Sequence, residues 1–235
     1  MRTSLVLLAL ALSACASPQM RGRYDSLRIP VANPSKVIAA ELAFARMARE
    51  EGTWTAFRHY ATDDALMPSP DFARVQEALK GVPDPAEPIV WGPDQVWSSC
   101  DGSFAVSTGG AEYPSGRRGR FLTIWQRQAD GEYRWVLDQG FDDSDAQVSP
   151  ETISAKVAEC GERRPERIRV RRGEPWASGL SNDGTLEWST QMAADCSRVV
   201  IIRTRAEDGS MQEAFRREAS APKVPEGTPS PSCTA

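Results

Sequence analysis

Residues 121–140 read FLTIWQRQADGEYRWVLDQG, and this stretch predicts two strands joined by a tight turn. Apolar and polar residues alternate on both sides of an Asp-Gly dipeptide, which is among the strongest short-range signals of a β-hairpin. A three-residue loop with its glycine in the left-handed conformation places Trp125 opposite Trp135 and Ile124 opposite Val136. We therefore expect an antiparallel hairpin at the centre of the fold.

The two faces of this hairpin are predicted to differ in chemistry. One face is aromatic, and the other is aliphatic except for one carboxylate. Since both faces carry apolar residues, we expect both to be covered at least in part. The predicted aromatic face carries Phe121, Thr123, Trp125, Tyr133, Trp135 and Leu137, and the other carries Leu122, Ile124, Val136 and Asp138.

The hairpin extends into a meander of four strands. The period of two begins near Glu87, and a second Asp-Gly turn stands at position 101. A glycine pair at 109 and 110 predicts a bulge or bend within the sheet. The predicted strands are Ile89–Ser99, Phe104–Tyr113, Arg120–Gln128 and Tyr133–Phe141.

Helical spacing dominates the chain before these strands. An apolar stripe from Ser35 to Glu51 predicts a helix that Gly52 ends. Thr53 begins a second, short helix, and Asp71 begins a third that runs up to a glycine at position 81. We therefore expect three helices packed on the meander.

These residues together resemble a known superfamily. The helical stretch AFARMAREEGTWTAFRHYATDDALMPSP (residues 43–70) and the hairpin are similar to the nuclear-transport-factor-2-like (NTF2-like) superfamily, in particular its ketosteroid-isomerase-like and DUF4440-type members. The resemblance covers about residues 36–143. It implies an α+β fold at residues 35–145, a cone of three N-terminal helices on a curved antiparallel sheet. Because this superfamily hosts enzymes, carriers and assembly domains, it implies no single function.

The resemblance also indicates where a catalytic base would stand. Isomerase-like members carry an aspartate before a proline just after the second helix, and the frame from Tyr60 to Pro70 is kept here. Ser69 occupies the position of that aspartate. A hydroxyl does not take a proton from carbon as a carboxylate does, so we favour a non-catalytic binding role over an enzyme.

An enzyme remains the alternative hypothesis, through Asp138 with Tyr60 or His59. A partly buried aspartate on a strand can have a raised pKa and act as a base toward a small hydrophobic substrate, in an isomerase- or dehydratase-like reaction. In the non-catalytic interpretation, Asp138 is an aspartate at the end of a strand and His59 is a surface residue. We interpret Asp63 and Asp64 as part of a helix-end turn, where aspartates bond backbone amides.

Four aromatic residues are candidates to line a pocket for a small apolar ligand. Tryptophans that alternate on strands are more often core residues of the sheet, and this is the interpretation we favour. The sequence contains no Gly-rich phosphate loop, so we expect no cofactor, and we expect no metal site because the chain has one histidine and no Cys-x-x-Cys spacing. The candidate ligand-binding residues are Trp91, Trp125, Trp135 and Tyr133.

Residues 146–220 predict a β-rich extension that begins with a helix. Pro150 begins the predicted helix Glu151–Glu159. The residues from position 221 to 235 are polar and rich in proline, and they predict a disordered tail. The predicted antiparallel strands between them are Thr185–Ala193, Arg198–Arg205 and Met211–Glu218.

The first residues of the chain resemble a bacterial lipoprotein signal peptide. A short basic region precedes the apolar run Leu5–Leu12, which is too short to span a bilayer, and the tetrapeptide ending at Cys15 is similar to a lipobox. The resemblance implies removal of residues 1–14, a lipid on Cys15 and a tether at 15–34. Ala16, by similarity to enterobacterial lipoproteins, implies the outer membrane, with the domain facing the periplasm. The alternative is an ordinary secretory signal with an accidental cysteine.

Four further cysteines predict two disulfides, since their number is even and the predicted compartment oxidises thiols. Four cysteines allow three connectivities, between which the sequence does not decide. We favour one bridge that ties a core strand to the following predicted helix and one that pins the tail. These pairs are Cys100–Cys160 and Cys196–Cys233.

The charge of the chain argues against nucleic-acid binding. It carries 28 Lys and Arg against 32 Asp and Glu, a net charge of −4. An arginine cluster between residues 163 and 172 is interleaved with glutamates, so we interpret it as a solvated strand and loop. The expected partners are a membrane through the lipid and either a small apolar ligand or an envelope protein. A homodimer is compatible with the sequence.

Overall fold

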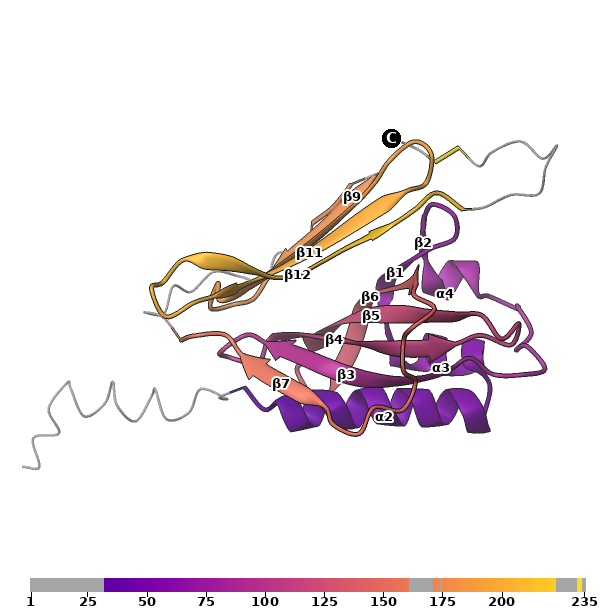
Figure 1. Ribbon diagram of the computed structural model, residues 1–235, viewed down its shortest axis with the longest axis horizontal. Coiled ribbons are helices and arrows are strands. Elements are labelled where there is room, and N and C mark those ends of the chain that lie inside the picture. The colour runs from indigo at the N-terminus through magenta and orange to yellow at the C-terminus, as the bar shows by residue number, and fades with distance from the viewer. Residues whose placement is uncertain (1–31, 161–170, 174, 223–231, 234–235) are drawn as a thin grey trace, which may run out of the picture. The chain divides into compact units, whose positions relative to one another are not determined.

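Two β-sheets and two N-terminal helices make up the described part of the chain (Figure 1). The computed structural model describes residues 32–160, 171–173, 175–222 and 232–233, all within one compact unit, Val31–Ala235. The predicted signal peptide, Cys15, most of the tether, the core of the arginine cluster and most of the predicted tail lie outside the described residues. The predicted α+β class is confirmed.

The first two helices are those that the residue spacing predicts. They are α2 (Pro34–Glu50) and α3 (Thr53–Tyr60). Pro34 stands in the first turn, where its missing N–H needs no partner. Gly52 separates the helices with a φ of 117°, a conformation that favours glycine. The buried face of α2 carries Val37, Glu41, Phe44, Ala45 and Ala48.

The prediction of a third helix from Asp71 is largely wrong. Only α4 (Val75–Ala78) is helical, and the residues before it form β2 (Phe72–Arg74), which pairs with β1 (Ala61–Pro68). Asp63 and Asp64 therefore lie on β1 rather than in a helix-end turn. β1 is extended because β6 supplies its hydrogen-bond partners. These partners are distant in sequence, so local propensity does not predict the pairing.

The larger sheet contains the predicted meander at its centre. Its strands are β3 (Val90–Ser98), β4 (Phe104–Glu112), β5 (Arg118–Arg127) and β6 (Tyr133–Asp142). β1 pairs in parallel with β6, and β7 (Ser154–Val157) pairs in parallel with β3. The order is β2-β1-β6-β5-β4-β3-β7, so this curved, open sheet is mixed. The prediction of an antiparallel sheet holds for the meander and is wrong beyond it.

The predicted helix Glu151–Glu159 is wrong, because its centre forms β7. All four residues of β7 are exposed. The edge of β3 offers hydrogen-bond partners instead, and the disulfide at Cys160 holds the end of the segment beside it. Strand pairing therefore prevails over the local helical pattern.

The smaller sheet confirms the three strands predicted in the extension. They are β10 (Leu186–Met192), β11 (Arg198–Arg205) and β12 (Met211–Ala219). β9 (Trp176–Leu180) was not predicted, and the three residues of β8 (Arg171–Gly173) pair along its edge. The sheet is antiparallel with the order β12-β11-β10-β9-β8.

A β-bulge in the central hairpin changes the predicted pairing. Trp125 pairs with Trp135, as we predict, but Ile124 pairs with Leu137 because the register shifts between the two pairs. Val136 is the extra residue on β6. The pairing of Ile124 with Val136 is therefore wrong by one residue.

This shift moves the side chains after the bulge to the opposite faces. Leu137 joins the aliphatic face of Ile124, and Asp138 pairs with Thr123 on the aromatic face. The predicted placement of Asp138 beside Leu122 is therefore wrong, because a one-residue slip reverses the alternation of a strand.

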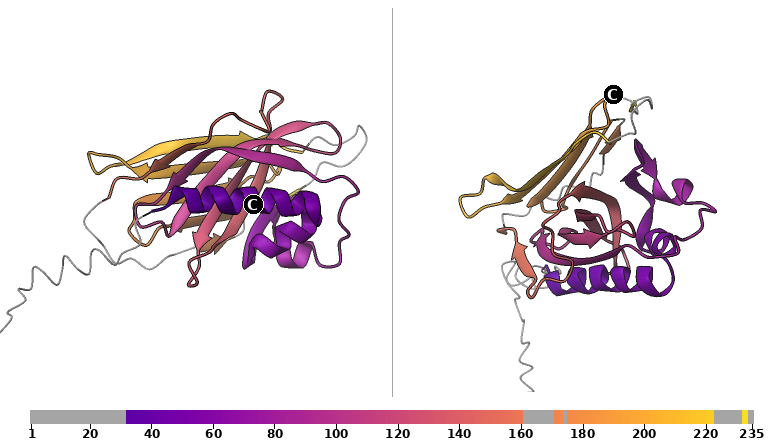
Figure 2. Two further views of the ribbon diagram at one scale, coloured as in Figure 1. Left: turned by 90° about the horizontal axis from the view of Figure 1, so that it is seen from below. Right: turned by 45° about the vertical axis from the view of Figure 1, so that its right-hand side comes forward.

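The larger sheet lies between the helices on one face and the smaller sheet on the other (Figure 2). We call the first interior the helix-facing core and the second the inter-sheet core. The helix-facing core includes Phe44, Phe57, Trp91, Phe121, Trp125, Tyr133 and Trp135. The inter-sheet core includes Val106, Leu122, Ile124, Leu137, Leu186, Trp188, Val200 and Ile202.

Both favoured disulfides are present. Cys100 is bonded to Cys160 and Cys196 to Cys233, each pair with a Cα–Cα distance of 5.2 Å. Such bonds form and persist in oxidising compartments, and they indicate an extracytoplasmic location. Among the helices described here, none combines the length and the apolar character that crossing a membrane requires.

Candidate functional site

A fully buried carboxylate, Glu41, lies at the centre of the helix-facing core. Helical spacing places it on the buried stripe of α2, where every other member is apolar. Three donors surround it: the indole Nε1 of Trp91 at 2.7 Å, the hydroxyl of Ser107 at 2.5 Å and the indole Nε1 of Trp125 at 3.1 Å. Such bonding is what a buried carboxyl group requires.

Burial raises the pKa of Glu41, because the charged form loses its hydration. The hydrogen bonds from Ser107, Trp91 and Trp125 oppose this rise, since they favour the carboxylate. Glu41 has no exposed surface, so it meets no solute from outside without a rearrangement of the core. The sequence carried one signal for this residue, an acidic side chain inside an apolar helical stripe, and the prediction did not use it.

Asp138 is the second carboxylate of this face and is only partly buried. It accepts a hydrogen bond of 2.7 Å from the hydroxyl of Thr123, which also interacts with Glu41. Burial raises the pKa of Asp138 to about 7, and the charge of Glu41 adds to the rise while the Thr123 bond opposes it. A carboxyl group of this pKa exchanges protons near neutrality, which is the property of a general acid or base.

The predicted pocket residues pack closely around Phe44 of α2. The ring centroid of Phe44 lies 4.8 Å from that of Trp91, 6.2 Å from Trp125 and 6.5 Å from Trp135. Tyr133 is buried nearby and donates its hydroxyl to the carbonyl of a turn residue, Gly102, at 2.6 Å. The structure thus brings the four aromatic residues into one core, with a side chain of the protein itself at its centre.

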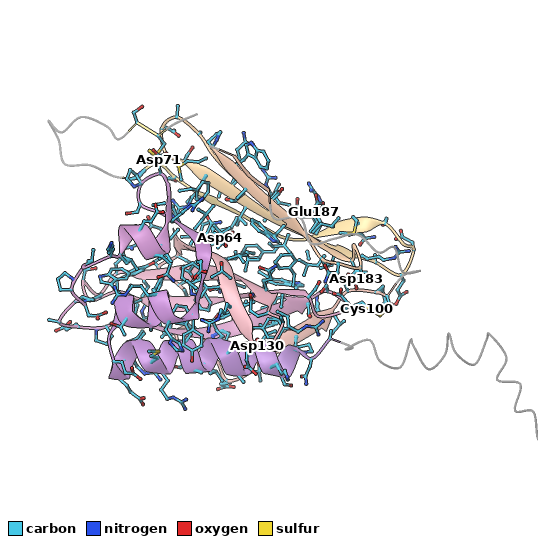
Figure 3. The ribbon with its side chains drawn as sticks, turned by 180° about the vertical axis from the view of Figure 1, so that it is seen from behind. Asp64, Asp71, Cys100, Asp130, Asp183 and Glu187 are labelled. Atoms are coloured by element: carbon cyan, nitrogen blue, oxygen red, sulfur yellow. A yellow bond between two sulfur atoms is a disulfide. The ribbon has the colours of Figure 1, made fainter. Side chains whose placement is uncertain are left out.

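His59 and Tyr60 line a surface groove of about 390 Å³ between α2 and the β5–β6 hairpin. The ring of Tyr60 also packs against the helix-facing core, 5.3 Å from that of Phe44 and 6.4 Å from that of Trp125. The rings of His59 and Tyr60 are 4.9 Å apart, and the backbone carbonyl of His59 accepts a bond of 2.6 Å from Arg134. Asp130, labelled in Figure 3, lines the same groove at the tip of the hairpin. Among the described residues, neither His59 nor Tyr60 is a hydrogen-bond partner of Asp138.

Ser69, at the position of the expected isomerase base, lies in the turn between β1 and β2. Its backbone N–H donates to the carbonyl of Asp71 at 2.7 Å, and its side chain is exposed. This turn stands at the edge of the larger sheet, where β2 is the last strand.

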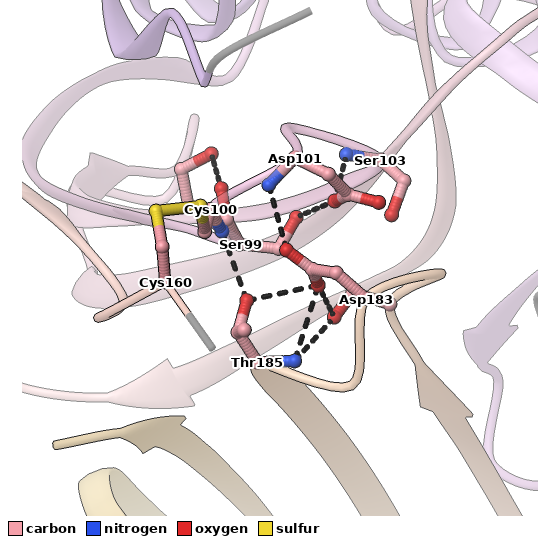
Figure 4. The surroundings of a disulfide bond; sticks show 9 residues. Ser99, Cys100, Asp101, Ser103, Cys160, Asp183 and Thr185 are labelled. Atoms are coloured by element: carbon pink, nitrogen blue, oxygen red, sulfur yellow. Dashed lines mark hydrogen bonds between the residues drawn. A yellow bond between two sulfur atoms is a disulfide. The ribbon is translucent and has the colours of Figure 1, made fainter. Parts of the chain in front are cut away.

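Two turns with the pattern Ser-x-Asp-Gly join the sheets beside the Cys100–Cys160 disulfide (Figure 4). The N–H of Cys100 donates to the hydroxyl of Thr185 at 2.9 Å, and the N–H of Asp101 donates to the carboxylate of Asp183 at 2.8 Å. Asp183 also accepts bonds from within its own turn, so its oxygens are occupied by protein donors. We interpret this junction as structural.

A line of ion pairs ties the sheets together on another side. Arg217 of β12 bonds Asp143 at 2.8 Å, and Asp143 lies 3.5 Å from the guanidinium of Arg120. Arg120 in turn bonds Asp94 at 2.7 Å, at the bulge of β3 opposite Gly109. The predicted irregularity at the glycine pair is confirmed here, because a Cβ on Gly109 would stand 2.0 Å from the carbonyl oxygen of a neighbouring strand.

Within the described ranges, no group of three or more His, Cys, Asp or Glu side chains is placed to hold a metal ion. The carboxyl groups described above in the helix-facing core are the fully buried Glu41 and the partly exposed Asp138. No protein-family model matches this chain, and no curated protein matches it.

Proposed function

We propose that this protein is a lipid-anchored protein of the bacterial envelope, facing the periplasm from the outer membrane, whose NTF2-like domain binds partners without catalysis. The lipobox-like tetrapeptide ending at Cys15 supports the anchor, and the two disulfides support an oxidising compartment. Ser69 at the expected base position supports the non-catalytic role.

The packing around Phe44 is the observation that carries the binding proposal. A small apolar ligand in the helix-facing core would have to displace this ring from its contacts with Trp91 and Trp125. Protein interiors are close-packed, and such a displacement costs several kcal/mol or more, of the order of a large-to-small core substitution. Binding through outer surfaces is therefore better supported than binding inside the cone.

Two experiments test this proposal. Labelled palmitate should be incorporated into the wild-type protein expressed in bacteria and not into Cys15→Ala, with Cys196→Ala as the matched cysteine control. Equal labelling of wild type and Cys15→Ala would contradict the anchor. Native mass spectrometry of residues 16–235, secreted into the periplasm behind an ordinary cleavable signal peptide and purified without detergent, should give the mass of the protein alone. A reproducible excess that is lost on denaturation would contradict the closed interior.

A proton-transfer enzyme is the second candidate, because Asp138 is partly exposed and its pKa is about 7. The test is exchange of an acidic C–H of a small cyclic enone in D₂O, followed by NMR, with wild type and Asp138→Asn compared. Exchange that the wild type accelerates and Asp138→Asn does not would support this candidate. Exchange at the buffer rate with both proteins would favour the non-catalytic role.

A further inference from the structure

The outer face of the smaller sheet carries a groove, which lies apart from the helix-facing core. It has a volume of about 450 Å³ and lies over the ends of β10, β11 and β12. Its lining includes Gln191, Ser197, Val199, Arg216 and Glu218.

An exposed tryptophan extends this groove. Trp176 of β9 pairs with Gln191, Gln191 with Val199 and Val199 with Glu218, so the four side chains form one cross-strand row. Because neighbouring strands are about 4.8 Å apart, the row is roughly 14 Å long. Trp176 is 40% exposed, whereas Trp188 on the opposite face of the same sheet is 1% exposed. Tryptophan is enriched at binding surfaces, because it joins a large apolar face to a polar N–H.

The charges along the row balance each other. Arg216 bonds Glu218 at 2.9 Å on the exposed face. Arg198, which also lines the groove, turns its guanidinium toward the larger sheet, where it donates to the side-chain oxygen of Gln139 at 3.1 Å and to the carbonyl of Gly140 at 2.5 Å. The open part of the groove therefore favours a neutral ligand over an anion or a cation.

An aromatic face beside an amide, a hydroxyl and a paired guanidinium and carboxylate matches the chemistry of a sugar. The C–H face of a pyranose ring stacks on an indole, and its vicinal hydroxyls both donate and accept hydrogen bonds. The Gln191 amide supplies both functions, and Glu218 accepts while Arg216 donates. The Ser197 hydroxyl donates to Asp195 at 2.6 Å, so it offers a ligand its acceptor. We propose that this row, the Trp176 row, binds a neutral glycan chain; the inference rests on the proposed envelope location, where such chains would be met.

Binding is tested on the mature full-length chain with two neutral probes, insoluble chitin in a sedimentation assay and N-acetylglucosamine trisaccharide by calorimetry. We expect the wild type to bind both. Trp176→Ala should weaken binding about tenfold or more, as loss of a central aromatic contact does, and Gln191→Ala should weaken it by a smaller factor. Trp176→Phe should retain part of the affinity, since it keeps a stacking ring.

Leu42→Ala is the matched control, because Leu42 is an exposed apolar residue, 47% accessible, on α2 and outside the Trp176 row. Its binding should equal that of the wild type, and thermal melting should show that all variants fold. Binding of neither probe, or binding that Trp176→Ala leaves unchanged, would overturn the glycan assignment. So would self-association, measured by analytical ultracentrifugation, that Trp176→Ala abolishes, because the row would then be an interface between copies. Palmitate labelling is independent of these outcomes, so failure of the inference and failure of the proposed anchor are distinguishable.

Discussion

The two cores on either side of the larger sheet are stabilised in different ways. The helix-facing core is built from aromatic rings around Glu41, whose oxygens accept bonds from Trp91, Ser107 and Trp125. The inter-sheet core is apolar, with aliphatic side chains packed around Trp97, Phe104 and Trp188, and it has hydrogen-bonded turns, ion pairs and a disulfide at its periphery.

This difference indicates which side of the sheet tolerates change. Aliphatic packing is non-directional, so similar side chains of equal volume can replace one another at modest cost. A buried carboxyl group with three donors is directional. Removal of this acceptor leaves the donors of Trp91 and Ser107 unsatisfied, whereas the indole N–H of Trp125 keeps its bond of 2.8 Å to the hydroxyl of Ser107. We therefore expect the cost of a substitution in the helix-facing core to depend on the hydrogen-bonding groups of the new side chain. In the inter-sheet core we expect it to depend on side-chain volume.

The largest effect is expected from Glu41→Ala. It should lower the free energy of unfolding by about 4 kcal/mol, because unsatisfied buried donors cost about 1–3 kcal/mol each and a cavity is added. Glu41→Gln keeps an acceptor and should cost about 1 kcal/mol. Urea unfolding at pH 7 measures both, with Leu122→Ala as the control for a pure volume loss in the inter-sheet core. If Glu41→Leu were as stable as the wild type, the contrast between the cores would be refuted.

The second effect is a pH dependence that comes from Asp138. Its pKa is raised to about 7 in the folded protein, so the folded state binds the proton more tightly than the unfolded state does. This contribution to stability is complete below about pH 4 and is lost as the pH rises to about 7, with an upper bound of roughly 4 kcal/mol. Glu41, whose pKa is also raised, acts in the same direction.

Unfolding by urea between pH 4.5 and pH 8 measures this dependence. The wild type should lose stability across the window, and Asp138→Asn, which does not titrate, should lose less. Leu122→Ala should keep the wild-type slope, because it lies in the other core. A slope that is identical for the wild type and Asp138→Asn would show that Asp138 is not the titrating group.

A third, smaller effect concerns the end of the smaller sheet. There the Cys196–Cys233 disulfide packs in a small cluster with Met192. Cys196 is the one non-glycine residue with a positive φ among the described residues, at 65°, a conformation that costs a side chain about 1–2 kcal/mol. With the disulfide removed in both, Cys196→Gly/Cys233→Ser should therefore be more stable than Cys196→Ala/Cys233→Ser by about 1 kcal/mol. Thermal melting of the two double variants tests this, and equal midpoints would mean that the backbone relaxes without the bond.

The smallest effect is expected at the periphery of the inter-sheet core. Arg217→Ala removes the bond to Asp143 and should cost about 0.5–1 kcal/mol at low salt, and less at high salt, where exposed ion pairs are screened. Arg216→Ala is the matched control, because its pair with Glu218 lies wholly on the exposed face and should contribute about zero. Equal losses for both variants would show that the ion pairs do not couple the sheets.

Local residue patterns were sufficient to predict the elements that have strong sequence signals. The apolar stripe before Gly52 predicted α2, and the two Asp-Gly turns at positions 101 and 130 predicted the hairpins of the meander. The even cysteine count suggested two disulfides, and the favoured pairing is the one present. In each case the deciding residues are neighbours in sequence or belong to a small set of alternatives.

The pairing of strands that are distant in sequence could not be predicted from local residue patterns. β1 and β7 are extended because β6 and β3 offer free edges to them, and neither segment carries that information in its own residues. Of the candidate site, Asp138 was found as a strand carboxylate, but Glu41 was missed, because an acidic residue in an apolar stripe is ordinarily a helix-surface residue. Its donors come from β3, β4 and β5, far away in the chain.

The sequence by itself determined the hairpins, the two helices and the residue types available to each core, because these depend on spacing over a few residues. The tertiary structure alone decided which face each side chain occupies after Val136. One bulged residue turns Asp138 toward Glu41 and Leu137 toward the smaller sheet. A strand alternates with a period of two, so a shift of one residue that is set by contacts across the sheet reverses every face beyond it.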